Sequence, residues 1–433
     1  MTDFKCYTKI MNIYFSGIGG VGIGPLAEIA HDAGYHVAGS DLEESLITKQ
    51  LRQKEINVSI GQQDGKYLSA RHRERPIDWF IYTSALSDNH PELALAKKLG
   101  IHTAKRDELL SYIINDKNLK LIGVAGTHGK TTTTGMLIWT LQKLGIPISY
   151  SVGTTLSFGP SGKYDPKSEY FVYECDEYDH NFLHFTPYMS LITSIDYDHP
   201  ETYPTENDYL DAFKKFAIGS EQVIAWADQH SELFESLPQT TIINPSTISP
   251  DLKLPGEHNR RNATLVQTAI KQLGFTQDIN DIINSFPGTD RRFEKLANNL
   301  YSDYGHHPIE ITATLQLARE LSDHVVLVYQ PHQNERQYKI RDQYTDIFEP
   351  AEKIYWLPTY LTRKDLELPI LKPEELIQHI TNKNQISIVD FDDDLWNAVQ
   401  TDLKENKLVV FMGAGKIDSW LRDRLSKPTN VTQ

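Results

Sequence analysis

Residues 126–134 read Gly-Thr-His-Gly-Lys-Thr-Thr-Thr-Thr and directly follow the apolar run Leu119–Ala125. The run predicts a strand, and the glycine-bearing segment predicts a loop that leads into a helix. In such a loop, backbone N–H groups face an anion, Lys130 adds a point charge and the Thr131 hydroxyl can reach Mg²⁺. Five residues separate Gly123 from Gly129, the glycine before Lys130. The general nucleotide pattern has four residues between these glycines, so the loop is a variant. We expect it to bind the phosphates of ATP, because a turn without a ligand explains neither the lysine nor the strand.

The composition excludes several classes of protein. Of the 433 residues, 39% are hydrophobic and 23% are charged, which suits roughly two to four globular domains. The net charge of −15 disfavours a nucleic-acid or anionic-membrane surface. The two cysteines, Cys6 and Cys175, fit a reducing cytoplasm better than a disulfide framework. No apolar run reaches the about 18 residues of a membrane span, and no signal core is present. We therefore expect a cytoplasmic protein without nucleic-acid or membrane partners.

The first block of the chain, residues 1–116, predicts a βαβ unit. A short apolar strand leads into the glycine turn 17–22, which reads Gly-Ile-Gly-Gly-Val-Gly. A helix and a strand over Tyr35–Gly39 follow, and Asp41 lies 19 residues after the last glycine. This is the dinucleotide fingerprint, which on its own allows a nicotinamide, a flavin or a nucleotide-sugar diphosphate. A turn with a purely structural role is the remaining alternative.

Two further blocks complete the chain. The second, residues 117–288, carries the phosphate loop, and the third, residues 289–433, again alternates strands and helices. In the third block the clearest strands are predicted over Val325–Tyr329 and Leu408–Met412. Alternation of this kind implies parallel sheets. The predicted fold class is therefore α/β with three domains: a Rossmann-like N-terminal domain, a P-loop ATPase-like central domain and a Rossmann-like C-terminal domain.

Four carboxylates follow a predicted strand of the second block. Glu174, Asp176, Glu177 and Asp179 lie within six residues of one another. A divalent cation would neutralise such a cluster, and Mg²⁺ prefers oxygen ligands. Glu174 is the best ligand candidate because it stands at the strand end. A solvated acidic loop is the alternative interpretation.

His199 follows the next predicted strand of the second block, after Asp196-Tyr-Asp198. A histidine beside acids at the carboxyl end of a strand can ligate a metal or hold a phosphate oxygen. A lone histidine is more often a structural hydrogen-bonding group, so both interpretations stay open.

Four other polar segments are candidates for ligand binding. The side chains of Asn259 and Asn262 offer the paired donor and acceptor that suit an adenine edge, or a helix cap. The pair 291–292, Arg-Arg, follows a predicted hinge and can clamp a phosphate when domains close, or be a surface pair. The segments 302–308 and 330–333 follow predicted strands, where open α/β sheets bind ligands, but are non-specific in isolation.

Taken together and in order, these motifs resemble the Mur ligase family, the ATP-dependent enzymes that add amino acids to the UDP-linked cell-wall precursor. The resemblance spans nearly the whole chain. The segments that carry it are 17–22, 39–41, 83–85, 88–92, 125–134, 198–199, 258–263, 291–293 and 303–308. The last of these, Asp-Tyr-Gly-His-His-Pro, is most similar to the branch that adds L-alanine.

The resemblance implies that the chain joins L-alanine to the lactyl carboxylate of UDP-N-acetylmuramate through an acyl phosphate. The implied cofactors are ATP and Mg²⁺, and the implied state is a monomer or homodimer. The first glycine turn would then hold the UDP-sugar rather than a nicotinamide.

The resemblance also implies a role for individual residues. The UDP-sugar would contact Gly17, Gly19, Gly20, Gly22, Ser40, Asp41 and Ser84. ATP would contact Gly126, Thr127, His128, Gly129, Lys130, Thr131, Thr132, Asn259, Asn262 and Asp303. The metal would be held by Thr131, Glu174 and His199. The catalytic groups would be Lys130, His199 and Arg292. The amino acid would contact Tyr304, His306, Gln333 and Arg336.

The chain departs from the family pattern at several positions. Gln333 stands where alanine-adding members carry an arginine that pairs with the amino acid's carboxylate, and Arg336 or Arg341 is a candidate substitute. Tyr178 stands where alanine-adding members more often have serine, and a tyrosine here resembles the sequence of the recycling ligases, which attach a whole tripeptide. Ser194 and Asp196 replace the usual Asn and Glu. These departures keep open a family ligase for a tripeptide or another small amino acid. Other branches of the family carry a carbamylated lysine near this position. In this chain we interpret Lys214 and Lys215 as surface lysines. A nicotinamide dehydrogenase would leave the phosphate loop unexplained, and a non-catalytic UDP-sugar scaffold would have no need for the charged residues around it.

Overall fold

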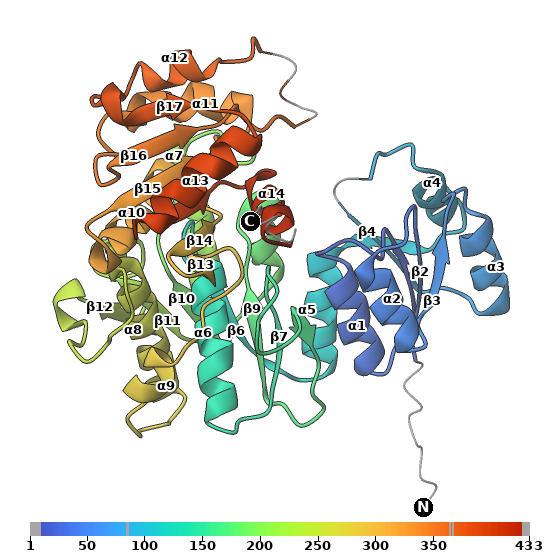
Figure 1. The fold of residues 1–433 in the computed structure, drawn as a ribbon. Helices are drawn as coiled ribbons and strands as arrows, with labels where there is room; N and C mark the ends of the chain where they lie inside the picture. Colours follow the sequence, from blue (N-terminus) through green and yellow to red (C-terminus); the bar gives the residue numbers. More distant parts are fainter. Residues whose placement is uncertain (1–9, 84–85, 363–364, 366–367, 427–433) are drawn as a thin grey trace, which may run out of the picture. The chain divides into compact units, whose positions relative to one another are not determined.

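The computed structural model describes residues 10–83, 86–362, 365 and 368–426, which form two compact units (Figure 1). Of these described residues, one unit contains those from 10 to 247 and Leu265–Ile283, and the other contains Ile248–Thr264 and those from 284 to 426. The chain passes between the units three times, after Thr247, after Thr264 within helix α8 (Glu257–Gln272) and after Ile283. The boundaries expected for the three blocks, 1–116, 117–288 and 289–433, are not tested by this division and stay predictions.

The N-terminal domain is a five-stranded parallel sheet in the order β3-β2-β1-β4-β5. Its strands are β1 (Asn12–Ser16), β2 (His36–Asp41), β3 (Asn57–Ile60), β4 (Trp79–Tyr82) and β5 (His102–Lys105). Its helices are α1 (Gly24–Asp32), α2 (Leu46–Gln53), α3 (Lys66–Glu74), α4 (Pro91–Lys98) and α5 (Arg106–Asp116). Strand β1 alternates between two cores: Ile13 and Phe15 pack with α1 and α5, whereas Tyr14 packs with α3 and α4. Both faces of the sheet are therefore covered, as a parallel sheet requires.

The central domain is a seven-stranded sheet in the order β12-β11-β10-β6-β9-β7-β8, in which only β8 is antiparallel to its neighbour. The strands are β6 (Lys120–Ala125), β7 (Ile148–Ser151), β8 (Gly162–Lys163), β9 (Tyr170–Glu174), β10 (Met189–Ile192), β11 (Val223–Trp226) and β12 (Thr240–Ile243). The helices are α6 (Lys130–Lys143), α7 (Glu206–Ile218) and α9 (Asn280–Asn284), with 3-10 turns η1 (Tyr178–His184), η2 (Ser231–Leu233) and η3 (Pro245–Thr247). Strand β6 lies between β9 and β10, so the segments that follow these three strands meet at one sheet edge.

The C-terminal domain is a six-stranded sheet in the order β13-β14-β18-β15-β16-β17, with only β13 antiparallel. The strands are β13 (Glu294–Ala297), β14 (Leu300–Asp303), β15 (Val325–Tyr329), β16 (Lys353–Trp356), β17 (Ile386–Ile388) and β18 (Leu408–Met412). The helices are α10 (Pro308–Leu321), α11 (Asn334–Ile340), α12 (Pro373–Ile377), α13 (Asp393–Lys404) and α14 (Ile417–Ser426), with 3-10 turns η4 (Arg341–Tyr344) and η6 (Lys383–Gln385).

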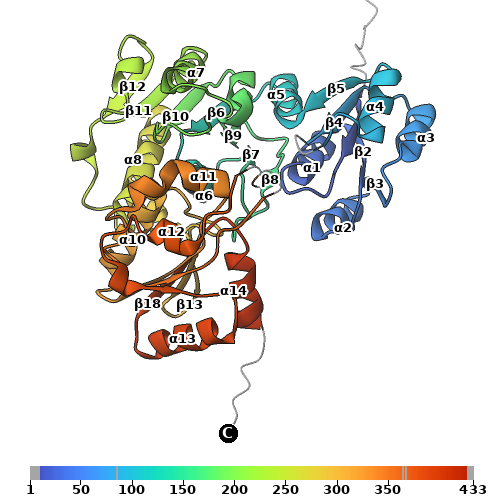
Figure 2. The ribbon, with the colours of Figure 1, turned by 90° about the horizontal axis from the view of Figure 1, so that it is seen from above.

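The two faces of this C-terminal sheet carry separate cores. Val325, Leu327 and Tyr329 pack with α10, α11 and α12, while Val326 and Val328 pack with α13 and α14. Figure 2 shows α13 and α14 on the side of the sheet opposite to α11 and α12. This two-sided burial explains why the strand is apolar at every position. The predicted fold class, α/β with parallel sheets and three domains, is confirmed.

Helices long and apolar enough to span a bilayer are absent from the part of the chain that the structure describes. Cys175 is buried with a free thiol, and Cys6 lies outside the described residues.

Candidate active site

The phosphate loop lies between β6 and α6, as the sequence predicts. Gly126 has φ 140°, and a Cβ there would lie 2.1 Å from Thr193 Oγ1 at the end of β10. Only glycine fits this close approach. The amide of Thr127 donates to Ser194 O at 2.9 Å, and the amide of His128 donates to Ser194 Oγ at 2.9 Å. Ser194, one of the departures from the family pattern, therefore fixes the shape of the loop.

The side chain of Lys130 is held within the loop and is only 14% exposed. Its ammonium donates to Gly126 O at 2.6 Å, to Thr127 O at 3.2 Å and to the two carboxylate oxygens of Glu177 at 2.8 and 3.1 Å. Burial alone would lower the pKa of Lys130, but the neighbouring carboxylates, Glu177 above all, raise it above the ordinary value. The lysine is therefore charged at neutral pH.

Sequence reasoning placed Glu177 among four acids of a possible cation site but did not predict its contact with Lys130. Its side chain is 1% exposed, and burial raises its pKa although Lys130 opposes that shift. Tyr209 donates to Glu177 Oε1 at 3.5 Å and shares a 2.8 Å hydrogen bond with Thr127 Oγ1. In the sequence Glu177 does not differ from Asp176 and Asp179, and only its burial against Lys130 distinguishes it.

The remaining acids of this segment have different partners. Thr131 Oγ1 donates to Glu174 Oε1 at 2.8 Å, and the Gly153 amide donates to Glu174 Oε2 at 2.8 Å. Asp176 accepts from the amide of Tyr178, and Asp179 pairs with Lys105. The structure thus brings together the hydroxyl and carboxylate of two of the three predicted metal ligands.

The third predicted metal ligand, His199, has φ 58° and lies beside Tyr178, with ring centroids 5.1 Å apart. Its Nε2 is 3.9 Å from Glu177 Oε1 and 3.8 Å from Asp198 Oδ2. Within residues 10–83, 86–362, 365 and 368–426, no three His, Cys, Asp or Glu side chains converge as a metal-binding group. The donor set, a hydroxyl beside a carboxylate, fits a Mg²⁺ ion that takes its other ligands from phosphates and water.

The glycine turn of the N-terminal domain lies between β1 and α1, as predicted. Gly17, with φ 77°, and Ile18 both donate their amides to Ser40 O, at 2.8 and 3.0 Å. The Gly19 amide donates to Asp41 Oδ2 at 2.7 Å. Ser40 and Asp41 therefore shape the turn itself. Ser84 lies outside the described residues.

A buried carboxylate accepts hydrogen bonds from residues of the same two strands, β1 and β2. Glu92 is 1% exposed and accepts from the hydroxyls of Tyr14, Ser16 and Ser40 at 2.6–2.7 Å. The Gln63 amide donates to Ser40 Oγ at 2.8 Å. Glu92 is a second polar residue whose role the sequence did not indicate, because its three donors come from two strands, β1 and β2, that are distant from it in sequence.

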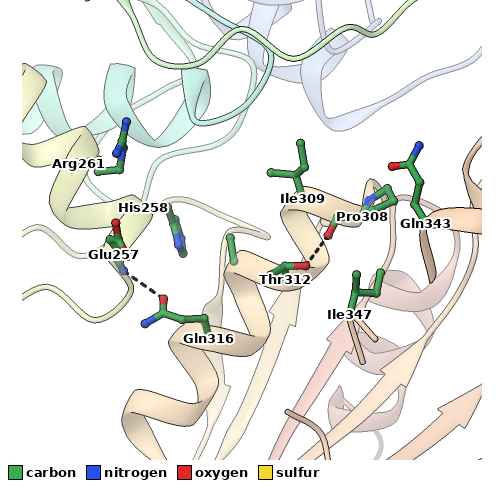
Figure 3. Close-up of a pocket in the computed structure, with 10 residues that line it drawn as sticks. Glu257, His258, Arg261, Pro308, Ile309, Thr312, Gln316, Gln343 and Ile347 are labelled. Carbon is green, nitrogen blue, oxygen red and sulfur yellow. Dashed lines mark hydrogen bonds between the residues drawn. The ribbon is translucent and has the colours of Figure 1, made fainter. Parts of the chain in front are cut away.

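In the C-terminal unit, a pocket of about 510 Å³ lies between the start of α8 and helix α10 (Figure 3). Its lining residues are Glu257, His258, Arg261, Pro308, Ile309, Thr312, Ala313, Gln316, Gln343 and Ile347. Burial lowers the pKa of His258 to about 4, so its imidazole is neutral. Figure 3 shows the Glu257 amide bound to Gln316 at one wall of the pocket. A largely apolar wall with a neutral imidazole suits a flat heteroaromatic ring.

The residues predicted for adenine and ribose binding differ in how they are occupied. The Asn259 side-chain amide donates to the backbone carbonyl of Pro255, four residues earlier, at 2.9 Å. Asn262 is 5% exposed, and its Nδ2 has no hydrogen-bond partner among the described residues. Asp303, 6% exposed, accepts from the Phe293 and Gly305 amides, both at 2.8 Å.

A cationic and aromatic cluster is formed by the segments before β13 and after β14. The guanidinium carbons of Arg291 and Arg292 lie 4.7 and 5.1 Å from the ring centroid of Tyr304. Arg292 is 3.6 Å from Glu310, and His306 Nδ1 is 3.3 Å from the same carboxylate. Burial lowers the pKa of His306 to about 4. The arginine pair is thus part of a structured cluster rather than a surface pair.

Gln333 occupies the position where the family pattern has arginine. It has φ 62°, and its amide donates to Tyr360 O at 2.8 Å. The neighbouring His332 ring stacks on Tyr360, 5.5 Å away, and lies 5.5 Å from the His306 ring. The pKa of His332 is lowered to about 4, chiefly by burial and next by the positive charge of Arg336. Arg336 therefore acts on the same cluster as the two histidines, one helical turn beyond Gln333.

These features define a class of protein. One α/β sheet carries a phosphate loop with a lysine, and the two other sheets carry a glycine turn or a polar cluster at their strand ends. This combination is typical of a multidomain nucleotide-dependent enzyme. Three family models match the chain: the Mur ligase family catalytic domain over residues 12–118, the Mur ligase middle domain over 124–243 and the Mur ligase glutamate ligase domain over 291–415.

Known proteins resemble the chain over nearly its full length. A UDP-N-acetylmuramate–L-alanine ligase of Carboxydothermus hydrogenoformans is 31% identical, over 95% of each chain. The crystal structure of a UDP-N-acetylmuramate–alanine ligase from Thermotoga maritima aligns with a TM-score of 0.71 and 24% identity, over 96% of this chain and 100% of that one. A murein peptide ligase from Psychrobacter arcticus aligns with a TM-score of 0.65 and 23% identity, over 98% and 100%. The chain belongs to the Mur ligase family and is an ATP-dependent ligase.

Proposed function

We propose that this enzyme joins L-alanine to the lactyl carboxylate of UDP-N-acetylmuramate, a step of peptidoglycan precursor synthesis. The observation that carries the proposal is the 31% identity, over 95% of each chain, to a relative named for this reaction. The carboxylate attacks the γ-phosphorus of ATP, ADP leaves and an acyl phosphate forms. The amine of alanine then attacks the acyl carbon, loses a proton to solvent, and phosphate leaves as the amide bond forms.

The phosphate loop is the proposed site of ATP phosphate binding. The N–H groups of residues 129–132 lie at the start of the 14-residue helix α6, where an anion is stabilised, whereas those of Thr127 and His128 already donate to Ser194. The Lys130 ammonium already contacts two loop carbonyls and a carboxylate. Exchanging one of these acceptors for a phosphate oxygen would place its charge on the transferring group, where positioning and neutralisation dominate catalysis.

Thr131 and Glu174 are the proposed Mg²⁺ ligands, supported by the 2.8 Å contact between their oxygens. Mg²⁺, when bound, would neutralise phosphate charge. His199 is proposed as a third group of this site because it lies at the end of the neighbouring strand segment, beside Glu177. Its role in catalysis stays a prediction.

The adenine is proposed to occupy the pocket beside His258, shown in Figure 3. The unpartnered amide of Asn262 supports this proposal because a buried donor without an acceptor is costly. Asn259 keeps its side-chain oxygen and the second N–H of its amide for a ligand, and Asp303 can reach a ribose only through the remaining lone pairs of its occupied carboxylate.

Tyr304, His306, Gln333 and Arg336 are the proposed amino-acid-binding residues, and Arg292 is proposed to stabilise the transferring phosphate. The shared contacts of Arg292 and His306 with Glu310 support a single cluster. The UDP-sugar is proposed to bind at Gly17–Gly22 with Ser40, Asp41 and Ser84 nearby. We further propose a cytoplasmic monomer or homodimer with no nucleic-acid or membrane partner.

Phosphate release from ATP tests the proposal. The assay contains UDP-N-acetylmuramate and Mg²⁺, with no amine, each free amino acid, or the tripeptide L-Ala-γ-D-Glu-diaminopimelate. We expect turnover with L-alanine above all other acceptors. Turnover with the tripeptide alone would contradict the proposal, make the chain a recycling ligase and give Tyr178 diagnostic weight.

A further inference from the structure

The glycine turn of the N-terminal domain uses most of its own amides to hold its shape. The amides of Gly17 and Ile18 donate to Ser40 O, and the amide of Gly19 donates to Asp41. The amide of Gly20 donates to Gly17 O, and the amides of Ile23, the N-cap of α1, and Gly24, its first residue, donate to Gly20 O. These N–H groups are directed into the protein and are not available to a ligand.

Two adjacent amides remain. Among the described residues, the N–H groups of Val21 and Gly22 have no hydrogen-bond acceptor. Pro25, in the first turn of α1, has no N–H to offer. The part of the turn that can donate hydrogen bonds to an anion is therefore confined to these two positions, although the sequence pattern covers six.

An arginine lies directly beside this part of the turn. A Cβ built on Gly22 would be 3.2 Å from Arg106 Nη1. Arg106 begins helix α5, next to the end of β5. Its side chain is 34% exposed, and its Cδ also lies beside the turn, 4.0 Å from the same Cβ.

The hydrogen-bonding capacity of Arg106 is only partly used. Its Nε and Nη2 donate to Asp107, and both distances are 3.4 Å, at the long end of the range. Its Nη1, the atom beside Gly22, has no hydrogen-bond partner in the described part of the chain. Asp107 in turn also accepts from the Tyr173 hydroxyl, so its charge is shared.

The neighbouring cation is used differently. Lys105 lies one residue earlier and forms an ion pair with Asp179. The two basic residues share a strand end, but only Arg106 faces the glycine turn with unused donors. The sequence Lys-Arg by itself does not distinguish them.

We propose that Arg106 binds the diphosphate of the UDP-sugar, together with the amides of Val21 and Gly22. The inference rests on the proposed function, which places a nucleoside diphosphate at this turn. A guanidinium can form paired, charge-assisted hydrogen bonds with phosphate oxygens, which two backbone amides alone cannot replace. Arg106 would thus select a diphosphate over a neutral ligand at the site where the fingerprint alone is ambiguous.

The test is isothermal titration of the full chain with UDP-N-acetylmuramate and with UDP alone. Three variants are compared with the wild type: Arg106→Gln, Arg106→Lys and the matched control Lys105→Gln. Arg106→Gln should weaken both ligands by roughly 10- to 100-fold, the range of a lost charge-assisted hydrogen bond. Arg106→Lys should recover part of the affinity. Lys105→Gln, which removes the same charge one residue away, should change the affinity by less than about threefold.

Three outcomes separate the inference from the function on which it rests. If the wild type binds UDP-N-acetylmuramate and Arg106→Gln binds it equally well, the inference is overturned and the proposed function stands. If the wild type itself does not bind the UDP-sugar, the proposed function fails. Equal losses in Arg106→Gln and Lys105→Gln would also overturn the inference, because the effect would then be one of overall charge. The ATP affinity and melting temperature of each variant show that it is folded, and Arg106→Lys carries the test if the glutamine variant is not.

Discussion

Replacing Glu177 by glutamine should destabilise the central domain far more than replacing Asp179 by asparagine. Both acids belong to the same segment after β9, and each contacts one lysine. Glu177 is 1% exposed beside Lys130, whereas Asp179 is 44% exposed beside Lys105. The two substitutions make the same chemical change at a buried and at an exposed ion pair.

The structure sets the expected magnitude. The closest charged atoms of Glu177 and Lys130 are 2.8 Å apart. At an effective dielectric constant of about 20, two unit charges at this distance attract by about 6 kcal/mol. Desolvation offsets part of this, and removing one partner of a buried pair costs about 3–5 kcal/mol. Glutamine can still accept a hydrogen bond from Lys130, so we expect the lower value, about 3 kcal/mol. The exposed pair of Asp179 should contribute about 1 kcal/mol or less.

Native-state hydrogen–deuterium exchange of peptides from β6 and β9 measures this difference. Because 1.4 kcal/mol is a factor of ten, Glu177→Gln should speed exchange there by about 100-fold and Asp179→Asn by less than about fivefold. The double variant Lys130→Met/Glu177→Gln should be more stable than the sum of the single changes implies, since no unpaired charge remains. Equal exchange in the two single variants, or strict additivity in the double variant, would refute the reasoning.

Three further predictions concern the amino-acid site, pH and the metal. Arg336→Ala should raise the KM for L-alanine by roughly 10- to 100-fold with a smaller change in kcat, because the carboxylate of the amino acid loses its cationic partner. The control Arg341→Ala should leave this KM unchanged. Equal KM values for the two variants would remove Arg336 from the site. Stability should fall as the pH drops from 6.5 towards 4, because three histidines have folded pKa values of about 4 against an ordinary 6.5, so the unfolded chain takes up protons first. These are His258, His306 and His332. Each adds at most about 1.4 kcal/mol per pH unit, and melting temperatures that stay constant between pH 7 and 4.5 would contradict this. Removing Mg²⁺ with EDTA should abolish phosphate release, and adding Mg²⁺ back should restore it. Activity that persists in EDTA would exclude the proposed role of Thr131 and Glu174 as metal ligands.

The strands that the sequence predicted best are those buried on both faces. Val325–Tyr329 and Leu408–Met412 were predicted with the observed bounds, because each is an uninterrupted apolar run between two helix layers. The strand expected over Tyr35–Gly39 extends instead over His36–Asp41. Its last residues are polar, and their place in the sheet depends on pairing with β1 and β3, which no local pattern contains.

The candidate site shows the same division. The phosphate loop and the closeness of Thr131 to Glu174 follow from strand ends that meet at one sheet edge, so the sequence pattern could indicate them. The role of Glu177 could not be predicted, because the three acids after the strand end, Asp176, Glu177 and Asp179, look alike until burial separates them. The same holds for Ser194, whose hydroxyl holds the loop from a different strand.

By itself, the sequence determined the fold class, the phosphate loop and the family to which the chain belongs. These features depend on local order: apolar runs, glycines at turns and a lysine at a helix start, all within a few residues of one another. The tertiary structure decided which of several similar groups have a partner: Lys130 with Glu177, Lys105 with Asp179, and Arg106 beside Gly22. The physical reason is that burial and pairing arise between strands distant in sequence, and only the folded sheet sets the distances on which electrostatic and hydrogen-bond energies depend.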